Sequence, residues 1–142
     1  MTRISFIILL VFSAIASLGQ ADGILPGDPG FRQKYADFDF KGKFAVVIEK
    51  DVANNYYLLD FSKLPARFDR VYFMNLSFGN YKIINVDPVV TENKVCFMAA
   101  RQYDEIEIAT IFEELKTKTS GLAATWTEEE KKMWLTKNDK YK

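Results

Sequence analysis

The most informative absence from this chain of 142 residues is histidine, which does not occur at all. Without an imidazole there is no Ser-His-Asp or Cys-His nucleophile and no histidine-ligated zinc. The sequence also lacks the G-x-x-x-x-G-K-S/T phosphate-binding loop and the G-x-G-x-x-G dinucleotide-binding motif. These absences favour a protein that is not an enzyme and that uses neither a cofactor nor a metal ion.

Cysteine is almost absent as well, because Cys96 is the only one. A single cysteine excludes an internal disulfide, a Cys-x-x-Cys redox pair, a thiolate zinc site and an iron–sulfur cluster. Cys96 stands in the apolar stretch 95–100, and free cysteine is among the most often buried residue types. We therefore favour a buried Cys96 over one that pairs with another chain.

Neither sign of charge is in excess, since the chain has 19 basic and 19 acidic residues. Removing the N-terminal signal described below takes away Arg3 and no acidic residue, which leaves 18 basic and 19 acidic residues and a formal charge of −1. A nucleic acid normally requires a basic face on its partner, and an anionic membrane attracts clustered basic residues. The composition therefore argues against both.

The N-terminus has the pattern of a cleavable secretory signal over residues 1–21. A basic start at Arg3 is followed by an apolar run, Phe6–Phe12, and then by small and polar residues. Small side chains permit cleavage after Gly19 or after Ala21. The apolar run is too short to span a membrane, which takes about 20 apolar residues. We expect a secreted or periplasmic protein with no transmembrane segment after cleavage.

The remaining chain divides into an N-terminal leader, residues 22–42, and a single α+β domain, residues 43–142. Apolar runs and alternating patterns predict five strands. They span residues 43–51, 56–61, 70–78, 81–86 and 94–101. The pair Gly79-Asn80 is typical of a tight turn between the third and fourth strands, and Asp87-Pro88 is expected to end the fourth.

Two helices are predicted at the C-terminal end, where the apolar spacing changes from two residues to between three and four. The first begins at the N-cap Asp104 and ends near Gly121; in the second, Thr127 and Glu130 form a capping box. Strands followed by helices indicate an α+β fold. We predict a five-stranded, mostly antiparallel meander sheet with the two helices packed on it, and Trp126 and Trp134 fastening the last helix to that sheet.

A group of aromatic residues on the second to fourth predicted strands is the candidate site for a ligand or partner. Exposed rings on a sheet bind glycans or proteins, whereas buried rings form cores and cross-strand pairs. The candidates are Tyr56, Tyr57, Tyr72, Phe73, Phe78 and Tyr81. Both faces of the third predicted strand begin with apolar residues, so both faces of the sheet must be covered there. We expect the C-terminal helices to cover one face, and a partner, the N-terminal segment or curvature of the sheet to cover the other.

The clusters of charged residues are weaker candidates for a functional site than the aromatic group. Asp37 and Asp39 are two residues apart, a spacing suited to acid–base chemistry or Ca²⁺ binding, but they are more typical of an exposed charged loop. The acidic block 128–130 and the basic pair Lys131-Lys132 are typical of the solvated face of a helix.

Three functions follow from these patterns. The leading hypothesis is a non-catalytic binding or protein-interaction domain of the cell envelope or extracellular space, which uses an aromatic sheet face or an open sheet edge. The alternatives are a carrier of small apolar ligands, with its pocket between a curved sheet and the helices, and a carboxylate-dependent hydrolase. The partners left open are another protein, a second copy of the chain, a glycan and an apolar small molecule.

Overall fold

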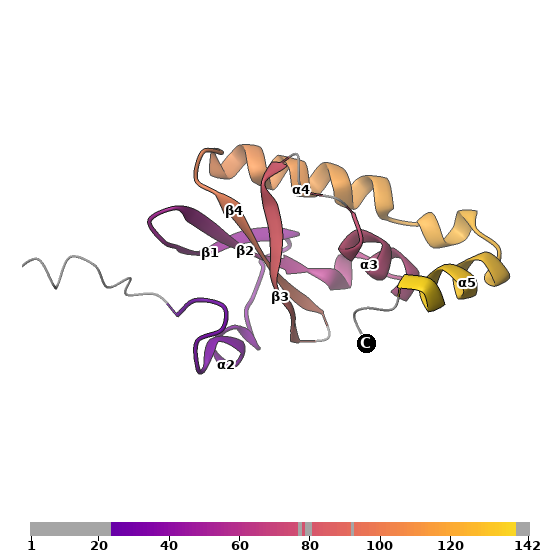
Figure 1. The fold of residues 1–142 in the computed structure, drawn as a ribbon, viewed down its shortest axis with the longest axis horizontal. Coiled ribbons are helices and arrows are strands. Elements are labelled where there is room, and N and C mark those ends of the chain that lie inside the picture. The colour runs from indigo at the N-terminus through magenta and orange to yellow at the C-terminus, as the bar shows by residue number, and fades with distance from the viewer. Residues whose placement is uncertain (1–23, 77, 79–80, 92, 139–142) are drawn as a thin grey trace, which may run out of the picture.

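The computed structural model describes residues 24–76, 78, 81–91 and 93–138 (Figure 1). It confirms an α+β fold with an antiparallel sheet. The described elements are α2 (Phe31–Tyr35), β1 (Ala45–Lys50), β2 (Asn54–Asp60), η1 (Phe61–Lys63), α3 (Arg67–Met74), β3 (Ile83–Thr91), β4 (Lys94–Ala100), α4 (Glu105–Thr119), η3 (Leu122–Thr125) and α5 (Glu128–Asn138). The predicted signal peptide and the predicted Gly79-Asn80 turn lie outside the described residues.

The sheet has four strands in the order β1-β2-β4-β3, with antiparallel neighbours throughout. The predicted five-stranded meander is therefore wrong in both its strand count and its connection. Because β2 and β3 each run antiparallel to β4, they run parallel to one another, and α3 makes the crossover between them. β4 fills the space between the two strands, which leaves β1 and β3 at the edges.

The error arises at the third predicted strand, residues 70–78, because residues 67–74 form the helix α3. α3 is only eight residues long, and its continuous apolar run Val71–Met74 also fits a buried strand. Phe73 faces the sheet, with its ring 5.6 Å from that of Phe44. Phe68 and Tyr72, four residues apart, lie on another side, with ring centroids 6.1 Å apart. A short apolar run of this kind cannot be assigned to a helix or to a buried strand from its periodicity alone.

β3 also runs past Asp87-Pro88, which the sequence predicted to end it. The pairing register with β4 shifts between Asn85 and Asp87 and again between Asp87 and Thr91. Proline lacks an N–H group, so it is tolerated in an edge strand or at such an irregularity. The position of β3 at the edge of the sheet explains why Pro88 does not break the strand.

One face of the sheet carries the main hydrophobic core, covered by α3 and α4. Aromatic rings fill the layer: the ring of Phe97 lies 6.2 Å from Phe73 and 5.8 Å from Phe112. Tyr57 from β2 lies 5.6 Å from Phe112. All four side chains are buried. The prediction that α4 packs on the sheet is confirmed, and Asp104 caps it by accepting the N–H of Ile106 at 2.6 Å.

The other face is covered by residues 24–40, which we call the N-terminal strap. Phe31, Tyr35 and Phe40 of the strap are buried against a second cluster that includes Leu58 and Cys96 on the sheet. Of the three covers considered for this face, the structure therefore shows the N-terminal segment. The expected burial of Cys96 is confirmed, with its side chain fully inaccessible.

The last helix, α5, packs on α3 and not on the sheet, which corrects the prediction for the second C-terminal helix. Its capping box is present: the N–H of Thr127 donates to Glu130 Oε2 at 2.8 Å, and the N–H of Glu130 donates to Thr127 Oγ1 at 3.2 Å. Trp126 and Trp134 fasten the helix to Phe68 of α3, with ring centroids 5.0 and 5.1 Å away. The sheet itself takes no part in these ring contacts.

A buried carboxylate fixes the chain between α4 and α5. Asp69 of α3 is fully inaccessible, and it accepts the backbone N–H of Gly121 at 3.2 Å and that of Ala123 at 2.8 Å. Gly121 has a φ of 79°, a left-handed conformation that glycine adopts without steric cost. The sharp reversal after α4 is therefore held directly to α3.

We predict that D69A lowers the free energy of unfolding by about 2 kcal/mol. The substitution removes the charged acceptor of two buried N–H groups and leaves both without a hydrogen bond. D69N retains one acceptor oxygen and should lose less. Urea unfolding followed by tryptophan fluorescence measures both effects. The matched control is E114A, on the exposed side of α4, which should change stability by no more than about 0.5 kcal/mol. Equal stability of D69A and E114A would contradict the role given to Asp69.

Candidate binding site

The six aromatic residues named from the sequence do not share one surface. Tyr57, Phe73 and Phe78 are buried in the main core, and Tyr56 is buried in the second cluster under the N-terminal strap. Tyr56 and Tyr57 separate because successive side chains of β2 point to opposite faces of the sheet, and Tyr72 and Phe73 lie on different sides of α3. Any part that these rings play in binding stays a prediction.

The remaining two aromatic residues have different surroundings. Tyr72 is half-buried and packs on Trp134, with a centroid distance of 5.5 Å. Tyr81, by contrast, is 40% exposed just before β3. Of these two residues, Tyr72 therefore belongs to an aromatic cluster, which lies between α3 and α5.

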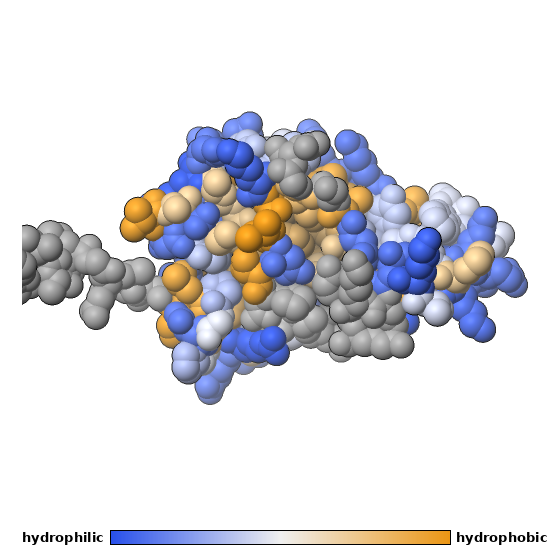
Figure 2. All heavy atoms as spheres, viewed as in Figure 1, coloured by the Kyte–Doolittle hydropathy of each residue, from blue (hydrophilic) through white to orange (hydrophobic). Residues whose placement is uncertain are grey.

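The two edges of the sheet are poorly suited to adding a strand from a partner. Figure 2 shows hydrophobic residues gathered in a strip over β3, where Ile84 is 51% exposed. However, β3 contains Pro88 and two shifts of register, and β1 shifts register between Val47 and Glu49. Proline and irregular pairing are features by which edge strands avoid pairing with other chains.

The candidate carboxylates Asp37 and Asp39 are exposed on the loop after α2. Asp39 accepts the N–H of Lys41 at 2.8 Å, a local turn contact. Across the described residues, no three Asp, Glu or Cys side chains gather closely enough to hold a metal ion. In that same part of the chain, no helix combines the length and apolar character needed to cross a membrane.

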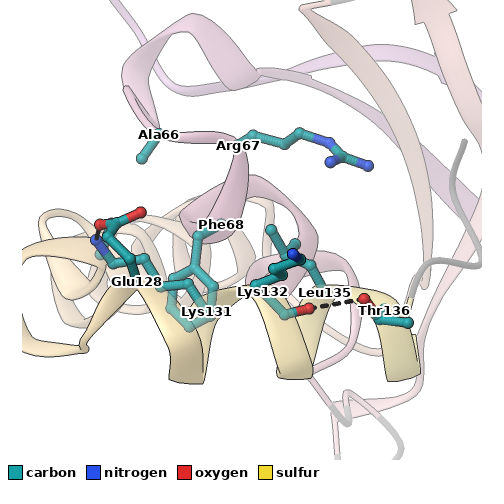
Figure 3. Close-up of a pocket in the computed structure, with 9 residues that line it drawn as sticks. Ala66, Arg67, Phe68, Glu128, Lys131, Lys132, Leu135 and Thr136 are labelled. Carbon is teal, nitrogen blue, oxygen red and sulfur yellow. Dashed lines mark hydrogen bonds and ion pairs between the residues drawn. The ribbon is translucent and has the colours of Figure 1, made fainter.

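A groove between α3 and α5 is the feature that gathers chemically useful side chains (Figure 3). Its volume is about 570 Å³, which lies in the range of small-ligand sites in proteins. The residues that line it are Ala66, Arg67, Phe68, Ala123, Glu128, Lys131, Lys132, Leu135 and Thr136. We call it the α3–α5 groove.

The floor of the groove is aromatic and rigid. Phe68 is 3% exposed and contacts Trp126, Trp134 and Tyr72. Leu135 extends the apolar part of the lining along α5. Tilted and edge-on ring packing of this kind stabilises a fixed arrangement beyond simple burial. Leu135, which is half-buried, is therefore the more accessible apolar side chain of the lining, and Phe68 lies beneath it as part of the packed ring cluster.

Three cationic side chains line the groove above that floor. Figure 3 shows Arg67 extending over the groove from the start of α3, with Lys131 and Lys132 on α5 and Phe68 between the two helices. Lys131 pairs with Glu128 at 2.5 Å, whereas Lys132 is exposed and no ion pair is seen for it within the described residues. The groove thus combines an apolar floor with an excess of positive charge.

Sequence reasoning missed this groove for two reasons. It interpreted Lys131 and Lys132 as part of a solvated helix face, and it placed residues 70–78 in a strand. The basic pair is indeed on a helix surface, but that surface faces Arg67 only because α5 turns back onto α3. The capping box at Thr127 was the one signal that fixed where α5 begins.

A second group of titratable residues holds the N-terminal strap. Tyr35 donates to Glu49 Oε1 at 2.6 Å, and Lys34 pairs with the same carboxylate. Burial, reinforced by that hydrogen bond, raises the pKa of Tyr35 from 10 to about 12. Burial acts to raise the pKa of Glu49, but the hydrogen bonds from Lys34 and Tyr35 outweigh it and lower that pKa.

The same pattern recurs at the start of β2. Tyr56 donates to Asp51 Oδ2 at 2.7 Å, and burial followed by this hydrogen bond raises the pKa of Tyr56 to about 12. Burial also raises the pKa of Tyr57 in the main core to about 12. Three tyrosines therefore hold their protons more tightly in the folded state than in the unfolded chain.

We predict that the free energy of unfolding falls as the pH rises from 10 to 12. A raised pKa in the fold stabilises it fully below the unfolded value, and this stabilisation is lost as the pH passes through the folded value. Urea midpoints, recorded together with tyrosinate absorbance, measure the effect. Y35F and Y56F should each make the decline shallower. A free energy that stays flat across this range would refute the assignment.

Comparisons with known proteins add no evidence about the groove. No family model matches the chain, and neither does any curated protein or solved structure. The functional argument therefore rests on the contacts and charges described above.

Proposed function

We propose that this chain is an exported, non-catalytic binding domain, and that it holds a negatively charged partner in the α3–α5 groove. Export is supported by the signal pattern of residues 1–21. The binding role is supported by the observation that Arg67, Lys131 and Lys132 line one groove over an aromatic floor. Among the described residues of that lining, Glu128 is the only acidic one.

The positive charge of the groove is a local feature and not a consequence of a basic protein. The chain after the signal has a formal charge of −1, so three cations around one groove are offset by acidic residues elsewhere. A local field of one sign over an apolar floor selects a partner of the opposite sign and speeds its approach. This charge contrast is the single observation on which the proposal depends.

The two other functions considered from the sequence have weaker support. For a carrier, the layer between the sheet and the helices is occupied by the contacting rings of Phe73, Phe97 and Phe112. For a hydrolase, Asp37 and Asp39 are exposed on a loop, away from an apolar pocket of the kind that raises a carboxyl pKa for acid catalysis. The groove remains the better candidate for function.

We predict that poly-L-glutamate binds to the purified domain and alters the fluorescence of Trp126 and Trp134, because both rings contact Phe68 in the floor of the groove. The variant R67E/K132E should weaken this binding by at least about tenfold, since like charges then face the polymer. The binding should also weaken as salt is added, in keeping with screening of exposed charges.

The matched control is K137E, which makes one of the same changes on α5 but outside the lining of the groove. It should bind poly-L-glutamate within about twofold of the unchanged protein, as expected for a charge outside the contact. Circular dichroism and urea midpoints confirm that each variant is folded. Equal weakening by K137E and R67E/K132E, or no binding by the unchanged protein, would overturn the proposed function.

A further inference from the structure

The N-terminal strap is attached to the domain in a way that lets it leave the sheet while the rest of the chain stays folded. We propose that the strap is a detachable cover: residues 24–40 open as one unit, turning about Lys41 and Gly42. Opening uncovers the sheet face on which Leu58 and Cys96 lie. The strap shares no residue with the α3–α5 groove, so the motion leaves the lining of the groove in place.

The strap is held together by its own contacts. Among the described residues, its backbone hydrogen bonds join strap residues to one another, apart from the N–H of Lys43, which donates to Phe40. Its aromatic rings also contact each other in chain order, with centroid distances of 5.0, 6.1 and 5.2 Å from Phe31 through Tyr35 and Phe38 to Phe40. A segment connected in this way keeps these contacts when it leaves the sheet, and so it can move as one body.

The attachment of the strap to the sheet is made by side chains. Glu49 of β1 accepts the hydroxyl of Tyr35 at 2.6 Å and pairs with Lys34, and Lys94 of β4 donates to the carbonyl of Ala36. The apolar contacts of the second cluster complete the attachment. Opening therefore breaks no backbone-to-backbone hydrogen bond between the sheet and the part of the strap that the structure describes.

The turn between the strap and β1 is the point about which the strap can swing. The N–H of Lys43 donates to the carbonyl of Phe40 at 3.0 Å, and the two residues between them, Lys41 and Gly42, have φ angles of 49° and 79°. Positive φ at both central residues is the geometry of a type I′ turn. A left-handed conformation is strained for lysine, and opening relieves that strain.

Cys96 is a built-in probe of this motion, because it is the only thiol of the chain and is fully buried in the cluster that the strap covers. Its rate of reaction with N-ethylmaleimide, followed by mass spectrometry, measures how often the thiol is reached under native conditions. We expect this rate to depend only weakly on urea well below the unfolding transition. The reason is that opening the strap exposes less surface than unfolding the domain.

Two variants should favour the open strap. E49A removes the carboxylate that Tyr35 and Lys34 share, and G42A strains the turn through its φ of 79° although the added Cβ meets nothing within 4 Å. Each should speed the reaction of Cys96 about tenfold. The matched control, E114A, removes an exposed carboxylate from α4 on the other side of the sheet and should leave the rate within about twofold.

D69A separates opening of the strap from unfolding of the whole domain, which would also expose Cys96. The loss of stability predicted above makes global unfolding about thirtyfold more frequent. The attachment of the strap is unchanged in this variant, so Cys96 should react within about twofold of its rate in the unchanged protein. D69N gives the same comparison at higher stability if D69A is too little folded.

Three results would overturn the detachable strap. One is an acceleration by D69A, or by D69N in its place, as large as that by E49A. Another is a reaction rate that rises with urea as steeply as global unfolding does. The third is an unchanged rate in either E49A or G42A. The function proposed for the α3–α5 groove is tested separately by poly-L-glutamate and stands in each of these cases.

Discussion

The arrangement of the C-terminal half depends on one buried carboxylate. Asp69 accepts two backbone N–H groups from the chain that follows α4, and in doing so it ties the reversal at Gly121 to α3. α5 is further placed by the ring contacts of Trp126 and Trp134 with Phe68 and of Trp134 with Tyr72. A buried charge is stable only when hydrogen bonds satisfy it, so Asp69 specifies one path for the chain. The α3–α5 groove exists because this path brings α5 back onto α3.

The division of the sheet into two covered faces explains why the groove lies at the end of the fold and not on the sheet. α3 and α4 bury one face and the N-terminal strap buries the other. The strap is held by hydrogen bonds as well as by packing, through Tyr35 to Glu49 and through Lys94 to the carbonyl of Ala36. Both faces are therefore covered from within the chain, and α5, which lines the groove, lies to one side of the sheet (Figure 1).

Near-neutral composition and a basic groove are compatible because charge acts locally. Exposed charges more than about 10 Å apart are largely screened at moderate salt, so a partner senses the charges nearest its path. Among the described residues that line the groove these are Arg67, Lys131 and Lys132; Lys131 pairs with Glu128, and Arg67 also has an interaction partner.

The sequence by itself determined the features that depend on neighbours in the chain: four of the strands, the Asp104 cap, the Thr127–Glu130 capping box and the burial of Cys96. Only the tertiary structure decided that residues 67–74 are helical, that β4 lies between β2 and β3, and that α5 packs on α3. Local signals follow from side-chain spacing and hydrogen bonds within a few residues. α3 is too short for its apolar run to be distinguished from a buried strand, and strand order reflects contacts between distant segments, which no local pattern records.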